Sequence, residues 1–368
     1  MAPGMRVAVC GSGPGGMAIA VHMAATGREA TVVDLPEFPS NVAAIAERGG
    51  VEVRSGWRAS QVVPAAATHD VAAAVTAADL VTISVPAFGH ERWVGEVLPS
   101  LRADAAVLFM GEGGGALVAR QALLEAGRRD VLVGETNCLP LIGRAAGPGV
   151  VTGDRKSGGV LLAAIPARRT EELAGLVRDV WPFAELSGSV WETTLVNYDA
   201  IDIVPVAVAN AATIEGRAGG VLLWGEGATS SVIRLIEALD GELYAVRRAL
   251  GGQDPRRYRD FLVAQGLAPD AGGLFEVMRS SGIMRSVRPS GSIDDLDARL
   301  ALEVSWTLAL ASSLGEAVGV STPVIDGLIA VSGAMLGRDL RREGRTLATL
   351  GLQDRDAEGL RRFAGEGT

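Results

Sequence analysis

Residues 5–16 read Met-Arg-Val-Ala-Val-Cys-Gly-Ser-Gly-Pro-Gly-Gly, and this stretch decides the expected fold of the chain. The apolar run 5–10, rich in β-branched valine, is typical of a buried strand. Gly11, Gly13 and Gly16 then satisfy the pattern G-x-G-x-x-G, and residues 15–26 are predicted to form a helix. In this pattern the glycines allow a tight turn, a close approach of phosphates to the backbone, and close packing of helix on strand. The free N–H groups at the helix start receive the anion.

A second apolar strand is predicted at residues 30–33, and it ends at Asp34, 18 residues after Gly16. A carboxylate at this position can accept hydrogen bonds from the ribose hydroxyls of NAD, and it would repel the 2′-phosphate of NADP. We therefore predict a dinucleotide site for NAD, with NADP as a possible alternative. The predicted cofactor contacts lie in the glycine loop, at the end of the second strand and after later strands: Gly11, Ser12, Gly13, Pro14, Gly15, Gly16, Met17, Asp34, Val85, Pro86, Ala87 and Glu112.

Composition narrows the class of protein. The chain has 368 residues, of which 48% are hydrophobic and 21% charged, so two domains with substantial cores are expected. The net charge of −9 argues against a nucleic-acid partner, which requires a basic surface. Cys10 and Cys138 are far apart and are predicted to be reduced core thiols. The apolar stretch 200–214 is too short to span a membrane and contains Asp202, and no apolar leader is evident, so we expect a soluble cytoplasmic protein.

The order of predicted elements indicates the fold class. Strands and helices alternate through residue 186, which is typical of a mostly parallel sheet. From Ser189 onward apolar residues recur at intervals of three and four, as in a series of helices. We therefore predict an α/β Rossmann-type domain at residues 1–187, followed by an all-α domain at residues 188–368. Pro205 is expected to kink or break the first long helix of the second domain. The sequence shows no metal-ligand spacing, and the three histidines, His22, His69 and His90, suggest no ligand cluster.

Several segments, in this order, resemble the opine dehydrogenase family, which includes the octopine and nopaline dehydrogenases. They include Val85-Pro-Ala-Phe-Gly-His-Glu91, Gly134-Glu-Thr, Glu192-Thr-Thr-Leu-Val-Asn197 and residues 205–215. The resemblance implies a Rossmann domain and a helical domain like the C-terminal domain of 6-phosphogluconate dehydrogenases, with substrate held between the two. It also implies that NADH or NADPH reduces the imine formed between an amino acid and an α-keto acid.

The resemblance further implies a catalytic histidine six residues after Asn197 and a catalytic aspartate directly after Glu303. In this chain those positions are Ile203 and Val304. Joint replacement is physically coherent, because a buried aspartate without its histidine would be an uncompensated charge. Hydride transfer to a protonated iminium neutralises a cation and requires no acid, whereas forming the imine from a carbinolamine does. The leading interpretation is therefore a reductase of imines that lacks the family's histidine and aspartate.

Substitute groups are present on the same predicted helix. Tyr198, Asp199 and Asp202 are spaced so that part of this set shares one face, and they are the candidate catalytic residues. An aspartate there could attract an iminium, or it could simply be solvated or cap the helix. Asn197 is a candidate substrate ligand. Arg144 could pair with a substrate carboxylate, or internally with Glu135, which is the third candidate in that set.

Three functions stay open on the sequence: an NAD(P)H-dependent imine reductase, an opine dehydrogenase with its acid relocated to Asp202 or Tyr198, and a non-catalytic dinucleotide-binding protein. The expected substrate is a small amine or imine that carries a carboxylate. Arg299 and Glu303 are expected to form a surface pair. A homodimer is expected through apolar residues of the helical domain, namely Leu222, Leu223, Trp224, Leu308 and Leu310.

Overall fold

A computed structural model describes residues 4–54, 60–111, 113–216, 221–282, 285 and 293–368. The chain divides into two compact units. Unit 1 comprises Met1–Lys156, Val160–Val190 and Ala364–Thr368, and unit 2 comprises Ser157–Gly159 and Trp191–Phe363. The domain limits 1–187 and 188–368 stay a prediction. Within the first range residues 157–159 group with unit 2, and within the second range residues 364–368 group with unit 1.

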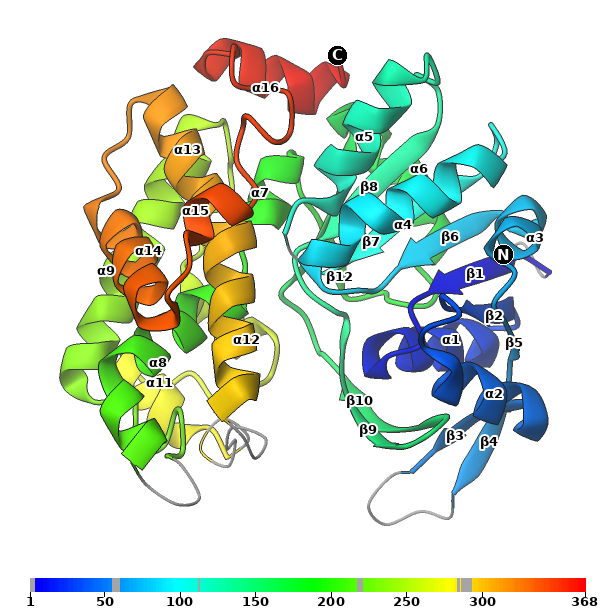
Figure 1. The fold of residues 1–368 in the computed structure, drawn as a ribbon, viewed down its shortest axis with the longest axis horizontal. Coiled ribbons are helices and arrows are strands. Elements are labelled where there is room, and N and C mark those ends of the chain that lie inside the picture. The colour runs from blue at the N-terminus through cyan, green and yellow to red at the C-terminus, as the bar shows by residue number, and fades with distance from the viewer. Residues whose placement is uncertain (1–3, 55–59, 112, 217–220, 283–284, 286–292) are drawn as a thin grey trace. The chain divides into compact units, whose positions relative to one another are not determined.

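Unit 1 is built on a sheet in the order β12-β11-β8-β7-β6-β1-β2-β5 (Figure 1). Neighbouring strands are parallel except for β11, which runs antiparallel to β8. The central strands are buried along their whole length, as expected where both faces of a parallel sheet are covered. The mostly parallel sheet predicted from the sequence is confirmed. The strands are β1 Arg6–Cys10, β2 Glu29–Val33, β5 Ala66–Thr68, β6 Leu80–Ile83, β7 Ala106–Met110, β8 Leu132–Thr136, β11 Val160–Ile165 and β12 Ala184–Leu186.

The helices of unit 1 alternate with these strands. They are α1 Pro14–Ala25, α2 Pro39–Arg48, α3 Val71–Ala77, α4 His90–Val97, α5 Gly115–Glu125 and α6 Thr170–Val177. Asp70 caps α3 by accepting a hydrogen bond from Ala73 N at 2.9 Å. Cys10 and Cys138 are both buried, and neither forms a disulfide bond, as predicted. The Rossmann-type half of the fold prediction is confirmed.

A second, smaller sheet of unit 1 was not predicted. Its order is β4-β3-β10-β9, with β3 Gly50–Val53, β4 Gln61–Pro64, β9 Leu141–Gly147 and β10 Val150–Arg155. Strands β9 and β10 form an antiparallel hairpin, and β10 pairs in parallel with β3. The sequence of β9 ends in Gly-Arg-Ala-Ala-Gly, which has no alternation of apolar and polar residues. Strand β9 is therefore held by its hairpin partner β10, and the pairing of β10 with the distant β3 joins this hairpin to the rest of the small sheet.

Unit 2 is helical, which confirms the second half of the fold prediction. Its elements are α7 Val190–Leu195, α8 Tyr198–Gly216, α9 Ser230–Ala249, α10 Tyr258–Ala264, α11 Leu274–Ser280, α12 Ile293–Glu303, a π-helical turn Val304–Leu308, α13 Ala309–Val318, α14 Pro323–Leu336, α15 Leu340–Glu343 and α16 Ala357–Glu366. Residues 364–366, at the end of α16, group with unit 1.

Helix α8 differs from the prediction at its proline. The helix continues through Pro205, and the interruption falls earlier, between α7 and α8. There the Asn197 side chain accepts a hydrogen bond from Ala200 N at 3.1 Å, which starts a new helix. Residues 200–207 of α8 are buried, and this packing holds the helix across the position where the proline donates no hydrogen bond.

Among the described residues one stretch, Val190–Gly216, meets the length and hydropathy criteria for crossing a membrane, with 61% of its most apolar window buried inside the protein. The core helix of a soluble protein meets the same criteria.

Candidate cofactor and substrate site

The glycine loop of unit 1 is shaped by backbone contacts that exclude larger residues. Gly11 has a φ of 100°, and a Cβ at this position would lie 2.5 Å from Ser84 O. A Cβ on Gly16 would overlap Gly11 O, so α1 can pack on β1 only with glycine there. A Cβ on Gly15 would lie 2.8 Å from Ser84 Oγ. The loop after β1 and the loop after β6 are therefore in close contact.

Gly13 differs from its neighbours because nothing described lies against it. It adopts an ordinary backbone conformation with a φ of −64°, and a Cβ added here would meet no described atom within 4 Å. This open space lies at the N-terminus of α1, where Pro14 occupies the first turn and the following N–H groups have no partner within the helix. The glycine loop thus leaves room for a pyrophosphate at a helix N-terminus, and the residues present fit a dinucleotide.

Asp34 is buried at the end of β2 and is held by three hydrogen bonds. Its Oδ2 accepts from Ser12 N at 2.7 Å and from Ser12 Oγ at 2.5 Å, and its Oδ1 accepts from Leu35 N at 2.8 Å. Only 6% of the residue is exposed. The structure therefore brings together two of the predicted cofactor residues. Oδ2 already accepts two hydrogen bonds, so Oδ1, which accepts one, is the oxygen with a lone pair left for a ribose hydroxyl.

Asn41, which was not predicted from the sequence, holds this loop in place through two hydrogen bonds. Its Nδ2 donates to Ser12 O at 2.8 Å, and its Oδ1 accepts from Gly149 N at 3.0 Å. Asn41 therefore ties the glycine loop to the turn between β9 and β10. No local signal marks it, because both partners are distant in the sequence.

The remaining predicted cofactor residues fall into three groups. Met17 is fully buried in the hydrophobic core, and only its backbone faces the loop, where its N–H donates to Gly13 O at 3.0 Å. Val85, Pro86 and Ala87 follow β6, and Val85 Cγ1 lies 2.8 Å from the position that a Cβ on Gly11 would take. Glu112 lies outside the described residues.

Asp202 is the central polar residue of unit 2. Its Oδ2 accepts hydrogen bonds from Trp224 Nε1 at 2.8 Å and from the Tyr258 hydroxyl. Its Oδ1 is buried and receives no hydrogen bond from any residue that the structure describes. Burial, and to a smaller extent the charge of Asp199, raises the pKa of Asp202 well above its ordinary value. Burial of Asp202 therefore favours its neutral, protonated form over the carboxylate.

The other two candidate catalytic residues on α8 have separate partners. Tyr198 donates its hydroxyl to Gly159 O at 2.8 Å, and its ring lies 6.1 Å from that of Tyr258. Asp199 pairs with Arg299 at 3.4 Å on the exposed surface. Both partners lie outside α8, so the helix does not present the three groups as one cluster.

Asn197 joins three elements of unit 2. Its Nδ2 donates to Glu303 Oε2 at 2.8 Å and to Thr307 Oγ1 at 2.7 Å, in addition to the bond that starts α8. Glu303 is only 4% exposed, so the expected surface pair of Arg299 with Glu303 is wrong; Arg299 pairs with Asp199 instead. The π-helical turn that follows Glu303 is a feature found frequently at functional sites.

The two positions that the family resemblance assigns to catalysis are apolar and buried. Ile203 is 3% exposed, and Val304 is completely buried at the start of the π-helical turn. Helix α8 packs against both α12 and this turn.

The predicted ligands Glu135 and Arg144 both lie in unit 1. Glu135 is fully buried in β8, and its Oε2 accepts from Ala116 N at 3.0 Å, at the N-terminus of α5. Arg144 is exposed on β9, and among the described residues it forms no ion pair with Glu135 or with another acid. The internal pair considered from the sequence is therefore absent from this part of the chain.

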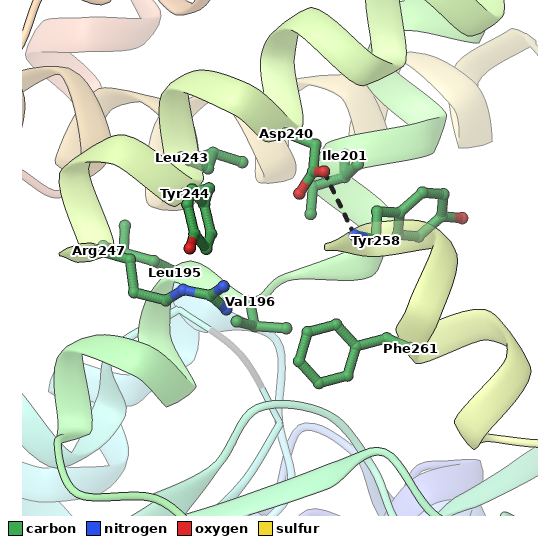
Figure 2. A pocket seen from close by; sticks show the side chains of 9 residues that line it. All are labelled: Leu195, Val196, Ile201, Asp240, Leu243, Tyr244, Arg247, Tyr258 and Phe261. Carbon is green, nitrogen blue, oxygen red and sulfur yellow. Dashed lines mark hydrogen bonds between the residues drawn. The ribbon is translucent and has the colours of Figure 1, made fainter. Parts of the chain in front are cut away.

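A small cavity in unit 2 lies between α7, α9 and α10 (Figure 2). Its free volume of about 10 Å³ is enough for about one water molecule and too small for an amino acid. Arg247 and Asp240 face it, the latter accepting a hydrogen bond from Tyr258 N at 3.3 Å. Arg247 is buried and donates to the carbonyls of Asp254 and Arg256. Burial raises the pKa of Asp240 and lowers that of Arg247. In the described ranges, no group of three histidine, cysteine or acidic residues is placed to hold a metal.

The glycine loop, Asp34 and the following helical unit define a class, the NAD(P)-dependent oxidoreductases with a Rossmann domain and a helical domain. Comparison with known proteins agrees. The family model described as the NAD/NADP octopine/nopaline dehydrogenase α-helical domain matches residues 186–336, and that of the ketopantoate reductases PanE/ApbA matches residues 7–140. An opine dehydrogenase of Arthrobacter sp. (strain 1C) is 30% identical over 96% of this chain and 97% of its own length. The chain therefore belongs to the opine dehydrogenase family.

Solved structures agree on the fold. An octopine dehydrogenase crystallised with NADH and L-arginine superposes with a TM-score of 0.78 at 18% identity, covering 99% of this chain and 98% of that one. A yersinopine dehydrogenase with bound NADP⁺ gives a TM-score of 0.71 at 15% identity, covering 100% of this chain and 99% of that one.

Proposed function

We propose that this protein is an NADH-dependent reductase of C=N bonds whose substrate arrives as a preformed, protonated imine. The observation that carries the proposal is the pair of buried apolar side chains, Ile203 and Val304, at the positions where the family resemblance implies an acid–base pair. The substrate class proposed is a small imine or amine that carries a carboxylate.

The chemistry of a protonated imine fits an apolar site. When bound, the nicotinamide supplies a hydride, and the hydride neutralises the cationic iminium carbon without the help of a protein acid. Reduction of a ketone, or loss of water from a carbinolamine, would place a developing charge beside Ile203 and Val304 with no donor from either. The protein's tasks are then to position the substrate and to exclude water.

The cofactor part of the proposal rests on unit 1. Gly13 leaves space at the N-terminus of α1, and Asp34 is held where it can receive the ribose hydroxyls. For the substrate carboxylate we propose Arg144, because its guanidinium is exposed and unpaired by any described acid, and its planar fork suits a carboxylate. We also propose that the protein is cytoplasmic, is a homodimer and has no nucleic-acid partner.

One observation favours a second candidate, an opine dehydrogenase with a relocated acid. Because Tyr258 and Trp224 both donate to Oδ2 of Asp202, a proton bound to this carboxyl would sit on Oδ1. Oδ1 has no hydrogen-bond partner among the described residues, so a proton on this oxygen would be available for transfer to a substrate. Asp202 would then supply the acid needed to condense an amino acid with an α-keto acid.

The decisive experiment measures NADH consumption with stable cyclic imines and with amino acid plus keto acid mixtures, as a function of pH. For a preformed iminium the hydride step slows as pH rises through the pKa of the substrate, and the profile moves when the substrate is changed. Asp202→Asn should then leave the profile in place, and Ile203→His with Val304→Asp should improve condensation more than reduction of a cyclic imine.

Two results would reject the leading proposal. A protein-derived titration that disappears in Asp202→Asn for all substrates would establish the relocated acid. No turnover with either substrate class at any pH, with dinucleotide binding intact, would favour the third reading, a cofactor-binding protein without catalysis.

A further inference from the structure

An arginine from a distant segment pairs with the turn that follows Asp34. Arg92, in the first turn of α4, forms an ion pair through Nη1 with Oε1 of Glu37. Both side chains are partly exposed, at 55% for Arg92 and 42% for Glu37. From the sequence alone no arginine is adjacent to Asp34, so the approach of Arg92 is a result of the tertiary structure.

Local geometry keeps this ion pair close to Asp34. Strand β2 ends in a tight turn in which Phe38 N donates to Leu35 O at 2.9 Å, so Glu37 sits inside the turn. Leu35 N in turn donates to Asp34 Oδ1 at 2.8 Å. Arg92 thus pairs with a residue of the turn that directly follows the carboxylate expected to receive the ribose hydroxyls, three positions after Asp34.

We propose that the Glu37–Arg92 ion pair sets the choice between NAD(H) and NADP(H), a proposal that rests on the dinucleotide site of the proposed function. Arg92 is the natural ligand for a 2′-phosphate, because a guanidinium offers a planar, always charged fork of donors to phosphate oxygens. Glu37 occupies that fork and adds a second negative charge beside Asp34. The ion pair therefore favours NAD(H): Glu37 occupies the guanidinium of Arg92, and its negative charge repels the 2′-phosphate of NADP(H).

The state of Glu37 suits this role. Its own backbone N–H and Arg92 hold the pKa of Glu37 below its ordinary value, so the carboxylate stays ionised across the neutral range. The pair is also dispensable for folding, since exposed ion pairs contribute little to stability. Substitution of either partner should therefore change ligand binding without unfolding unit 1.

The test is a binding titration of NADH and NADPH, followed by protein fluorescence at low and moderate salt, with wild type, Glu37→Gln, Arg92→Ala and the double variant. Glu37→Gln should tighten NADPH about five- to tenfold and change NADH less than about twofold, and added salt should reduce the gain. Arg92→Ala in the Glu37→Gln background should remove the gain. Glu171→Gln breaks a similar exposed pair with Arg178 on α6 and serves as the matched control, with both affinities unchanged.

Any of the following outcomes overturns the proposal: an unchanged NADPH affinity in Glu37→Gln, a gain that survives in the double variant, or a wild type that already prefers NADPH and loses this preference in Arg92→Ala. Equal weakening of both cofactors by Arg92→Ala also overturns it, because the arginine would then serve the shared part of the ligand. Binding is measured without turnover, so a failure of the reductase proposal leaves this test intact, whereas a wild type that binds neither dinucleotide rejects the proposed function itself.

Discussion

At the scale of single residues, Asp34 illustrates how a carboxylate is prepared for a ligand. Two donors from Ser12 and one from Leu35 fix its orientation before any ribose arrives. We expect the wild-type protein to prefer NADH to NADPH, and Asp34→Ala to weaken NADH about tenfold and to relax the preference. Steady-state comparison of the two cofactors measures this, with thermal unfolding as the control for the lost Ser12 bonds. Equal or better efficiency of the wild type with NADPH would contradict it.

Asp202 leads to a second prediction at this scale, on stability. The pKa of this carboxyl is raised in the folded protein, so the folded state holds the proton more tightly than the unfolded chain, where the pKa is about 3.9. Its contribution to stability is thus complete below about pH 3.9 and is lost as pH rises toward the folded pKa. Asp202→Asn mimics the neutral acid and should lack this loss, so its stability relative to wild type should rise with pH.

Urea unfolding of wild type and Asp202→Asn at several pH values between 5 and 9 measures this difference. Glu316→Gln is a suitable control, because Glu316 is an exposed acid on another helix of unit 2, α13, and pairs with Arg341. Parallel pH profiles for wild type and Asp202→Asn would mean that Asp202 is ionised in the folded protein.

At the scale of elements, we expect two glycines of the turn between β1 and α1 to have different roles: Gly16 is required for packing, and Gly13 is required for cofactor binding. Gly16→Ala forces a Cβ onto Gly11 O and should destabilise unit 1 by about 1–3 kcal/mol or more. Gly13→Ala meets no described atom and has an allowed φ, so it should fold normally and yet weaken NADH binding by about tenfold, because its methyl group enters the phosphate space.

Thermal unfolding and NADH titration of these two variants give the comparison. If Gly13→Ala bound NADH as tightly as wild type, the space at the start of α1 would not be the pyrophosphate site. If both variants were equally destabilised, the distinction between the two glycines would fail.

At the scale of the whole molecule, the homodimer expected from the sequence needs a different surface. Leu223, Leu308 and Leu310 are buried inside unit 2, and the Trp224 indole donates a hydrogen bond to Asp202. Helix α14 instead exposes Val331 and Met335, one turn apart, at 46% and 42%. The neighbouring positions of the same helix, Ala330, Gly333, Ala334 and Gly337, are small and line an open groove of about 400 Å³.

In a homodimer related by a two-fold axis, the projecting side chains of Val331 and Met335 of one copy would lie against the groove of the other. In an antiparallel arrangement Asp326, near the start of α14, would also lie opposite Arg338, just after its end. We expect a mass of about twice 37.9 kDa by light scattering, and a monomer for Val331→Glu combined with Met335→Glu. Val62→Glu, at an exposed valine of unit 1, is the control. A wild-type mass near 37.9 kDa at micromolar concentration would contradict the prediction.

The sequence by itself determined the features whose partners are neighbours in the chain. The glycine turn, Asp34 at the end of β2, the Asp70 cap and the change from an alternating to a helical pattern are all encoded within a few residues, and the structure has each of them. Periodicity and turn chemistry are local properties, so they can be read without knowledge of the fold.

Only the tertiary structure decided which distant groups meet. The small sheet requires β3 to pair with β10, and Asn41 meets the turn at Gly149. In the same way Tyr258 meets Asp202, and Arg92 forms an ion pair with Glu37. It also assigned Asn197 and Glu303 to each other, where the sequence suggested Arg299 as the partner of Glu303. Such pairings are fixed by how whole elements pack, and residue spacing carries no record of them once the partners lie tens of residues apart.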